Sequence, residues 1–413
     1  MSTAPPPLSG TEKSARRRML GLVFATILID FIGFSVLIPV LPIFMEKLGA
    51  SSFEVGLILA LYAAAQLVFL PAWGWLSDRI GRRPVILVSL LGTVASFLLL
   101  AAAPSIGMVY AARVLAGFFA ASIGTAQAVV TDVTPPEERA QSMGLIGAAF
   151  GLGFVVGPAL GGQLSRLDPL APFYGIAILA AVNLVLAWFF LPESRPAELR
   201  VRNWKGLGRT LVPSPVRLVF ALHDRRIGQY LYLFFQLFTA FAALESMFTL
   251  FLSRRFALGP PEAGKIFFVI GLFIALTQGV LIRRLAPALG ERKLVVIGLV
   301  MTGVGLGAIP FAPGVGLLYV LGPIIAVGNG LAFPSFTSLY SKACEAEKAG
   351  ELMGESQSMA TAGRIVGSVV AGLLFDRLGD WSPFVISGAL MFVTLALFWL
   401  WRPTLLGERP VAP

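Results

Sequence analysis

Twelve long apolar stretches, each close to the length that crosses a lipid bilayer, constrain the fold of this chain more than any other feature. A helix needs about 20 mostly apolar residues to span the roughly 30 Å hydrocarbon core. The stretches lie near 19–44, 53–76, 84–103, 106–131, 142–164, 170–191, 229–253, 263–283, 293–312, 314–341, 350–374 and 380–401. The ninth and tenth form one continuous uncharged run, in which Pro310, Pro313 and Gly314 predict a turn. We therefore predict an all-α membrane protein with twelve transmembrane helices.

The composition excludes several other classes of protein. Of the 413 residues, 57% are apolar and 13% are charged, whereas a soluble domain carries about 25% charged residues. Runs such as 85–103 lack the alternation of an outer-membrane strand. The single Cys344 and the single His223 exclude a disulfide framework and leave almost nothing for a metal site or imidazole catalysis. We expect no metal, no cofactor and no enzymatic activity.

The basic residues predict the orientation in the membrane. Loops on the side of the N-terminus carry 24 Lys and Arg, and the loops of the other side carry about six. The positive-inside rule then places both termini in the cytoplasm of a multi-pass protein of the cell membrane. This bias accounts for most of the net charge of +10, so we favour it over the rival interpretation, a nucleic-acid patch. The basic N-terminal residues and the apolar stretch after them lack an A-x-A site, which predicts a retained helix rather than a signal peptide.

A long polar interval divides the twelve stretches into two sets of six. We expect a cytoplasmic tail (1–18), a six-helix bundle (19–191), a cytoplasmic linker (192–228), a second six-helix bundle (229–401) and a cytoplasmic tail (402–413). The linker is rich in Arg, which is compatible with an amphipathic helix on anionic lipid headgroups and equally with a solvated loop.

The two sets of stretches repeat one another. Glycines of the fifth stretch recur 210 residues later in the eleventh. The matched residues are Gly153, Gly157 and Gly162 in the first half and Gly363, Gly367 and Gly372 in the second. Repeated bundles around a central site at the membrane midplane are typical of secondary transporters.

Several motifs in the expected order resemble the major facilitator superfamily over nearly the whole chain. Residues 74–84, with the sequence GWLSDRIGRRP, are similar to the signature loop between the second and third spans of that family. The run 153–162 is similar to the motif that marks its antiporters, through Gly153, Gly157, Pro158, Gly161 and Gly162. Arg113, Gly117 and Ala121 fit a third motif in the fourth span. Asp30 and Gly33, followed by Pro39 and Pro42, resemble the first span of tetracycline and multidrug exporters.

The resemblance implies a fold of two pseudo-symmetric six-helix bundles and a function in transport. A member of this branch would export small amphipathic organic compounds by alternating access, with the proton gradient in place of a cofactor. Its partners would be its substrate, protons and membrane lipids, and we expect a monomer. Other functions stay open on the same fold: a lipid or lysolipid flippase, a uniporter or importer of small metabolites, and a receptor or scaffold that transports nothing.

The signature loop is a candidate gate at the cytoplasmic face. The resemblance implies that Asp78 and Arg82 pair with each other and with Asp132, and that they latch the outward-facing state. We expect Asp78 to hold an Arg only when the cytoplasmic ends are together. The candidate gate residues are Gly74, Asp78, Arg79, Gly81, Arg82, Arg83 and Asp132. The alternative is that the three Arg only set topology, and the corresponding loop of the second half, 279–290, lacks an Asp.

The glycines of the fifth stretch leave one helix face nearly bare, which allows close packing, and Pro158 adds a kink. A rocking transporter needs such a contact. Packing alone would select the same glycines, so a role in antiport and a purely structural role both stay open.

Ionisable residues within the apolar stretches are the sharpest functional signal, because charge in hydrocarbon is costly. Asp30 lies about ten residues into the first stretch, roughly 15 Å deep. Arg113 enters the fourth stretch from the other side, so the two can meet near the midplane. Burial favours a protonated carboxyl and a nearby guanidinium favours its charged form, which makes Asp30 a candidate proton site with Arg113 as its partner. A static ion pair between them is the alternative.

A second set of candidates would line the substrate cavity. Glu245 and Arg364 either pair across the cavity or leave Glu245 to bind a cationic substrate, and Gln357 shares a helix face with Arg364. The remaining cavity candidates are Phe34, Gln66, Gln127, Gln236, Asn329 and Phe333.

Overall fold

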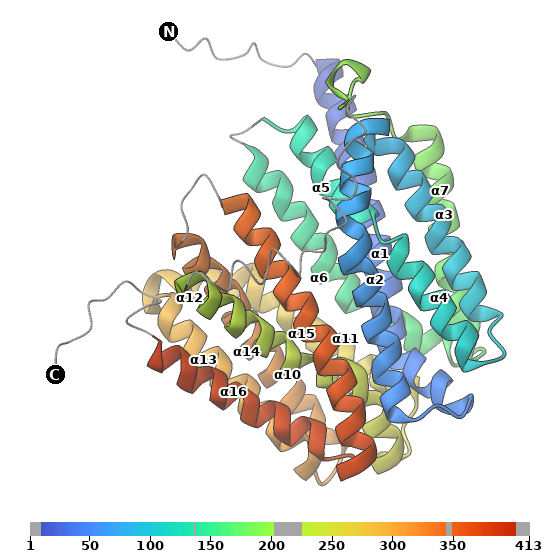
Figure 1. The fold of residues 1–413 in the computed structure, drawn as a ribbon. Coiled ribbons are helices and arrows are strands. Elements are labelled where there is room, and N and C mark those ends of the chain that lie inside the picture. The colour runs from blue at the N-terminus through green and yellow to red at the C-terminus, as the bar shows by residue number, and fades with distance from the viewer. Residues whose placement is uncertain (1–9, 136–137, 202–224, 344–348, 402–413) are drawn as a thin grey trace.

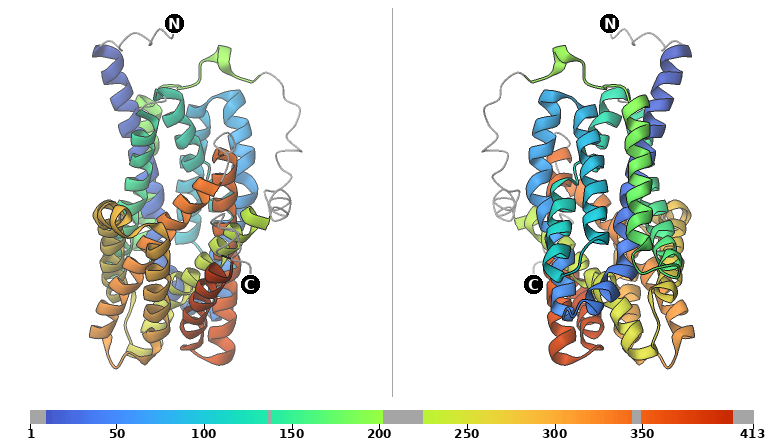
Figure 2. Two further views of the ribbon diagram at one scale, coloured as in Figure 1. Left: turned by 90° about the vertical axis from the view of Figure 1, so that its left-hand side faces the viewer. Right: turned by 90° about the vertical axis from the view of Figure 1, so that its right-hand side faces the viewer.

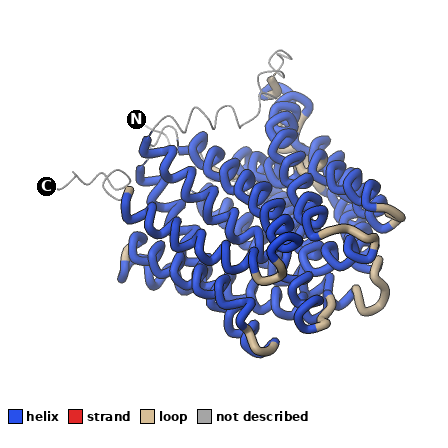
Figure 3. Tube along the Cα trace, turned by 60° about the horizontal axis from the view of Figure 1, so that its bottom comes forward, coloured by secondary structure: helices blue, strands red, loops and turns tan. Residues whose placement is uncertain are grey.

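The computed structural model describes residues 10–135, 138–201, 225–343 and 349–401. Within these ranges all regular elements are helices (Figure 3). Twelve spans in this part of the chain are long and apolar enough to cross a membrane, and they lie close to the predicted stretches. The predicted all-α, twelve-span fold is confirmed. The tail 402–413, the first residues of the N-terminal tail and most of the linker, with its suggested amphipathic helix, lie outside the described residues.

The first half contains six spans, the fourth of which is divided. Its helices are α1 (Gly10–Lys47), α2 (Ser52–Ile80), α3 (Arg82–Ala101), α4 (Ile106–Phe118), α5 (Ser122–Val133), α6 (Arg139–Leu164) and α7 (Ala171–Phe190). The helices α4 and α5 together form the fourth span. A short 3₁₀ turn, η2 (Ala197–Leu199), follows α7.

The second half contains the other six spans. Its elements are α10 (Arg225–Phe256), α11 (Pro260–Leu276), η3 (Thr277–Leu281), α12 (Ile282–Leu289), α13 (Glu291–Ala308), η4 (Ile309–Phe311), α14 (Val315–Ala343), α15 (Ala349–Leu378) and α16 (Ser382–Leu400). A π-helical turn, η3, joins α11 and α12 into one span. The long apolar run is a hairpin as predicted, because the 3₁₀ turn η4 ends α13 before α14 begins.

The helix ends define two faces of the molecule. We call the face where α2 ends and α3 begins the linker face, and the face where α1 ends and α2 begins the opposite face. Gly81 and Gly290 make equivalent tight turns on the linker face, with φ of 107° and 76°. Few residues other than glycine adopt such φ values, so each glycine lets one helix end and the next begin at once.

The glycine repeat has the same structural use in both halves. A Cβ on Gly153 or Gly157 would collide with α1, and one on Gly363 or Gly367 would collide with α10. Each half therefore packs its fifth span directly against the backbone of its first, as pseudo-symmetric repeats would.

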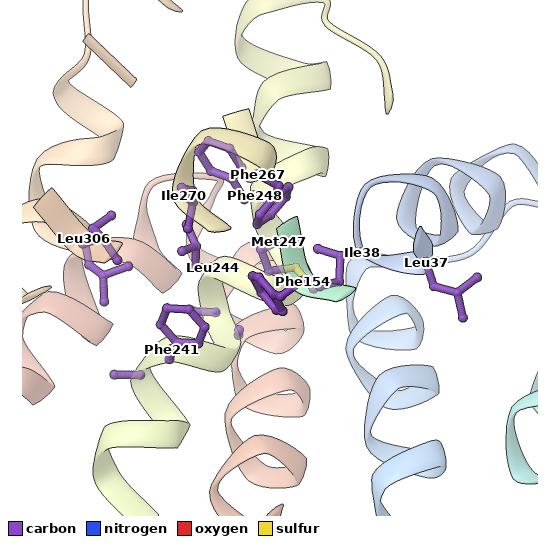
Figure 4. Packing of buried hydrophobic residues seen from close by; sticks show 14 of the residues in the cluster. Leu37, Ile38, Phe154, Phe241, Leu244, Met247, Phe248, Phe267, Ile270 and Leu306 are labelled. Carbon is purple, nitrogen blue, oxygen red and sulfur yellow. The ribbon is translucent and has the colours of Figure 1, made fainter. Parts of the chain in front are cut away.

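The two halves join along α2 with α15 and α6 with α11. Figure 4 shows Met247 of α10 beside Ile38 of α1 and Phe154 of α6 in the buried apolar cluster at this seam. Thr249 donates a hydrogen bond across it to the carbonyl of Ile38 (3.4 Å). In Figure 1 the helices of the first half stand nearly upright and those of the second run obliquely. In the side views of Figure 2 the second half lies lower than the first. The halves meet toward the opposite face and separate toward the linker face.

Candidate functional site

A small cavity lies inside the first half, at membrane depth, between α1 and the helices α2 to α5. Its volume is about 40 Å³. The side chains of Asp30 and Arg113 both line it. The other lining residues are Gly33, Phe34, Tyr62, Thr93, Phe97, Ala116, Ala120, Ser122 and Ile123. The two charged residues that the sequence singles out therefore share one cavity.

Asp30 is held in this cavity by the first residue of α5. Ser122 donates a hydrogen bond from its hydroxyl to Asp30 Oδ2. The amide of Ser122 in turn donates to Ser89 Oγ of α3 (3.1 Å). Three helices thus fix the position of the carboxyl.

The break between α4 and α5 makes this arrangement possible. A helix break in a membrane leaves carbonyls without intrahelical donors, which must find other partners. The carbonyl of Phe118 accepts from the indole of Trp73, and that of Phe119 accepts from Ser89 Oγ, both at 2.5 Å. Gly92 has no Cβ to collide with the Phe119 ring. The carbonyls at the break beside Asp30 therefore have hydrogen-bond donors. Sequence reasoning missed this break.

Arg113 makes a ring contact and not the static ion pair that the sequence leaves open as an alternative. Its side chain is buried, and its guanidinium lies 4.4 Å from the centre of the Tyr62 ring. Its Nε has no hydrogen-bond partner in the described part of the chain. No ion pair within 4.0 Å joins Arg113 to Asp30 among these residues. The alternative of a static ion pair is therefore wrong, because Asp30 is held by Ser122 and Arg113 by Tyr62.

A line of aromatic contacts connects this cavity to the second half. The rings of Tyr62 and Phe34 are 5.9 Å apart, centre to centre. The guanidinium of Arg364 also lies over the Phe34 ring, 5.2 Å from its centre. A group in the first half and a charge in the second therefore touch the same ring, where the halves meet.

Glu245 and Arg364 form a bidentate ion pair. Arg364 donates from Nη2 to Glu245 Oε1 (2.6 Å) and from Nε to Oε2 (3.2 Å). The pair joins α10 and α15, which are neighbours within the second half, so it does not reach across to the first half. Of the two predicted arrangements, the structure shows the ion pair. The pair lies within the second half and not across a cavity.

The other predicted cavity residues are dispersed. Phe333 packs edge-on against Phe238, 5.3 Å away, near Arg364. Gln236 is buried between α10 and α16, where its Oε1 accepts from Thr394 (3.1 Å), so its amide is already engaged away from the cavity. The rest lie on α2, α5, α14 and α15 outside the cavity lining and are partly or fully exposed. These are Gln66, Gln127, Asn329 and Gln357.

The predicted gate residues cluster on the linker face. Arg82 is buried and donates to Asp78 Oδ1 (2.8 Å), Asp132 Oδ2 (3.2 Å) and Ser77 Oγ (2.5 Å). The contacts expected between Asp78, Arg82 and Asp132 are therefore present. All three belong to the first half, and they pair although the halves are apart on this face. The expectation that Asp78 holds an Arg only when these ends are together is wrong.

The remaining gate residues bind locally. Arg79 stacks on Trp75, with its guanidinium 3.7 Å from the ring centre, and Arg83 donates to the carbonyl of Trp188 at the end of α7. Gly74 is exposed on α2. Gly81 has a positive φ, and because it lacks a Cβ, the carboxylate of Glu193 can lie directly against it.

The segment after α7 belongs to this cluster, which sequence reasoning missed. Glu193 Oε1 accepts from the amide of Arg82 (2.8 Å), and Arg195 Nη1 donates to Asp78 Oδ1 (3.0 Å). Ser194 donates to Asp132 Oδ2 (3.3 Å). A Pro-Glu-Ser-Arg sequence directly after a span was the available signal.

The second half has an analogous pair with reversed charges. Glu291, at the start of α13, pairs with Lys342 at the end of α14 and accepts from Ser338 Oγ (2.9 Å). Arg82 and Asp132 occupy the same helix ends in the first half. The second half therefore has an ion pair on this face although residues 279–290 contain no Asp.

The glycine motif of α6 packs against the helix that carries Asp30. Ser35 Oγ of α1 donates to the carbonyl of Gly153 (2.7 Å), and Gly157 and Gly161 lie against Ser35 and Val36. Pro158 and Gly162 contact α11 of the other half. The motif therefore connects the Asp30 helix to the seam between the halves.

Comparison with known proteins agrees with this architecture. The family model described as Major Facilitator Superfamily matches residues 23–289 and 255–412. The class E tetracycline resistance protein of Escherichia coli is 30% identical over 394 residues, which cover 94% of this chain and 96% of that protein. Multidrug resistance protein 2 of Bacillus subtilis (strain 168) is 28% identical over 386 residues, covering 92% and 94%.

A solved structure shows the same fold. The crystal structure of a bacterial homolog of the human lysosomal transporter Spinster, in an inward-facing and occupied conformation, matches with a TM-score of 0.76. The match covers 98% of this chain and all of the Spinster homolog, at 14% sequence identity. At this identity the match shows likeness of fold alone. Matches over both halves, together with twelve spans, identify a multi-pass membrane transporter rather than an enzyme. The chain belongs to the major facilitator superfamily.

Proposed function

We propose that this protein exports small amphipathic organic compounds in exchange for protons. The observation that carries the proposal is the shared cavity of Asp30 and Arg113 at membrane depth, connected through Tyr62 and Phe34 to Arg364 of the other half. Similarity to tetracycline and multidrug resistance proteins supports export of such compounds.

The coupling follows from the charges in the cavity. When Asp30 is ionised, its carboxylate and the Arg113 guanidinium offset one another, and a polar or cationic group of a substrate is attracted to the carboxylate. When Asp30 is protonated, only the positive charge of Arg113 remains and that attraction is lost. Proton and substrate then weaken each other's binding by the same factor, which is the requirement for exchange.

The substrate and the proton occupy different spaces. A cavity of about 40 Å³ has room for water molecules, whereas pockets for drug-sized ligands measure roughly 300–1,000 Å³. We therefore place the substrate between the halves, against Phe34, Phe333 and the Glu245–Arg364 pair, and the proton at Asp30 behind the ring of Phe34.

Alternating access and orientation are parts of the same proposal. The positive-inside bias assigns the linker face to the cytoplasm, with both termini there. The halves, which meet at the opposite face, then form an inward-facing state. The protein would act as a monomer surrounded by membrane lipids, with the proton gradient as its energy source and no cofactor.

Proton release on substrate binding tests the proposal. Purified protein in weakly buffered detergent solution is mixed with a panel of amphipathic compounds, and the pH change is recorded. Compounds that bind should release protons from the parent protein and bind to Asp30→Asn without release. Asp168→Asn, an exposed acid on the opposite face, is the control and should behave like the parent. Equal proton release from the parent and Asp30→Asn would contradict the proposal.

A further inference from the structure

The two halves approach most closely along α2 and α15, at the opposite face. These helices run antiparallel, so the end of α15 lies beside the start of α2. A Cβ on Gly372 would lie 2.9 Å from the Cα of Phe53, and a Cβ on Gly56 would lie 2.9 Å from the carbonyl carbon of Ser368. Backbone therefore meets backbone across the seam, and polar groups of the two chain segments come within hydrogen-bond distance.

Asp376, in the last turn of α15, binds the N-terminus of α2. Its Oδ1 accepts from the amide of Ser52 (3.1 Å) and its Oδ2 from the amide of Phe53 (2.8 Å). The next amide, of Glu54, donates to Ser51 of the same half (3.2 Å). The first N–H groups of a helix have no intrahelical acceptors, and their partial positive charge favours an anion. The other half thus supplies the acceptor for two of them.

The position of Asp376 on its own helix makes this contact specific. A carboxylate near a helix C-terminus faces the negative end of that helix's dipole and is unfavourable there unless a partner compensates it. The pattern Gly-x-x-x-Asp-Arg-x-Gly occurs twice, at the end of α2 with Asp78 and at the end of α15 with Asp376. Asp78 has Arg82 and Arg195 of its own half. Asp376 is compensated by α2, across the seam.

The pseudo-equivalent contact in the other half of the seam is an ion pair between two side chains, without a helix N-terminus. Arg166 lies 210 residues before Asp376, and Glu262 lies 210 residues after Ser52. Arg166, two residues after the end of α6, pairs with Glu262 of α11 at 3.6 Å, and 48% and 34% of their side chains are exposed. Exposed pairs of this kind contribute little to stability. The Arg166–Glu262 pair is therefore a matched comparison for the Asp376 contact. It lies at the equivalent position of the repeat, and it joins two side chains where Asp376 binds backbone amides.

Arg254 of α10 adds two further contacts across this seam, to Ser52 Oγ (3.2 Å) and to Glu46 Oε1 (3.7 Å). We infer that Asp376, which binds two backbone amides of α2, is a polar clamp between the halves at the opposite face, and that every transport cycle must release it. The inference rests on the alternating access of the proposed function. Opening the opposite face separates Asp376 from α2 and leaves the carboxylate at the unfavourable end of α15. The clamp thus stabilises the state closed at this face, to a degree that solvent limits because Asp376 is exposed.

Labelling of a cysteine buried in the seam tests the clamp. Thr249, at 1% exposure, lies against Ile38 of the other half, so Thr249→Cys in a Cys344→Ser background reports opening at this face. Protein in nanodiscs is treated with a polar thiol reagent, without substrate or pH gradient. Asp376→Ala should raise the labelling rate about fivefold, as loss of a helix cap of about 1 kcal/mol would. Arg166→Ala should change it less than twofold, and Asp376→Glu should restore slow labelling.

The result that overturns the inference is Asp376→Ala labelling no faster than Arg166→Ala. If Asp376→Ala fails to fold, Ser52→Pro removes one N–H of the same contact at a helix position that accepts proline. It should speed labelling more than Ser52→Ala, which removes only the hydroxyl that accepts from Arg254. Melting temperatures establish that each variant is folded. Because labelling needs neither proton nor substrate, failure of proton coupling would leave this outcome unaffected, and the two proposals fail separately.

Discussion

The buried guanidinium of Arg113 faces the ring of Tyr62, whereas the sequence predicts the carboxylate of Asp30 as its partner. A buried charge without a partner is costly, and an aromatic face offsets part of that cost by about 2 kcal/mol when water is excluded. In the proposed mechanism, the contact of Arg113 with Tyr62 lets Asp30 exchange a proton without breaking an ion pair. Pairing of the two residues would instead favour the charged form of Asp30.

Replacement of Tyr62 tests this ring contact. Tyr62→Leu removes the aromatic face and should destabilise the protein by about 1–2 kcal/mol, with loss of transport. Tyr62→Phe keeps the ring and should stay close to the parent in both respects. Thermal unfolding in detergent and transport assays in proteoliposomes measure the two effects. A Tyr62→Leu variant as stable and active as Tyr62→Phe would show that the ring does not support Arg113.

Glycine faces decide how the helices of each half approach one another. Gly157 of α6 lies against α1, where a Cβ would be 2.9 Å from the carbonyl oxygen of Ile32 and 3.0 Å from Ser35 Cβ. Gly151, nearly two turns earlier on the same helix, has no heavy atom of a neighbouring element within 4 Å of such a Cβ. The two glycines therefore differ in what a methyl group would meet.

A pair of alanine substitutions separates packing from helix propensity. Gly157→Ala should lower the free energy of unfolding by about 1–3 kcal/mol, because α1 and α6 must move apart. Gly151→Ala should raise it by up to about 1 kcal/mol, because alanine favours the helix. Melting temperatures of the two purified variants measure both effects. Equal changes in both would contradict the role of Gly157 in packing.

Sequence reasoning predicts features that depend on local composition and misses those that depend on distant partners. The spans follow from apolar length, and the hairpin at η4 follows from Pro310. The break between α4 and α5 could not be predicted, because it depends on Trp73 and Ser89 to satisfy its carbonyls. The contacts of Glu193 and Arg195 were missed for the same reason, since they join segments more than 100 residues apart.

The whole molecule consists of two repeated halves that share a fold and differ in their charges. The proposed proton site, Asp30 with its cavity, lies in the first half, and the repeat places Ala240 at the position of Asp30 in the second. The second half instead carries the Glu245–Arg364 pair. On the linker face the ion pairs of the two halves have reversed charges. In the proposed function, this asymmetry lets one half respond to protons while both halves move together.

Transport driven by an imposed pH gradient tests whether Asp30 couples that movement to protons. Proteoliposomes containing the parent protein should accumulate a compound from the binding panel against its concentration gradient, and the accumulation should collapse when the pH gradient is dissipated. Asp30→Asn should lose this accumulation and keep exchange of labelled for unlabelled compound at equal concentrations. Undiminished gradient-driven accumulation by Asp30→Asn would contradict the account.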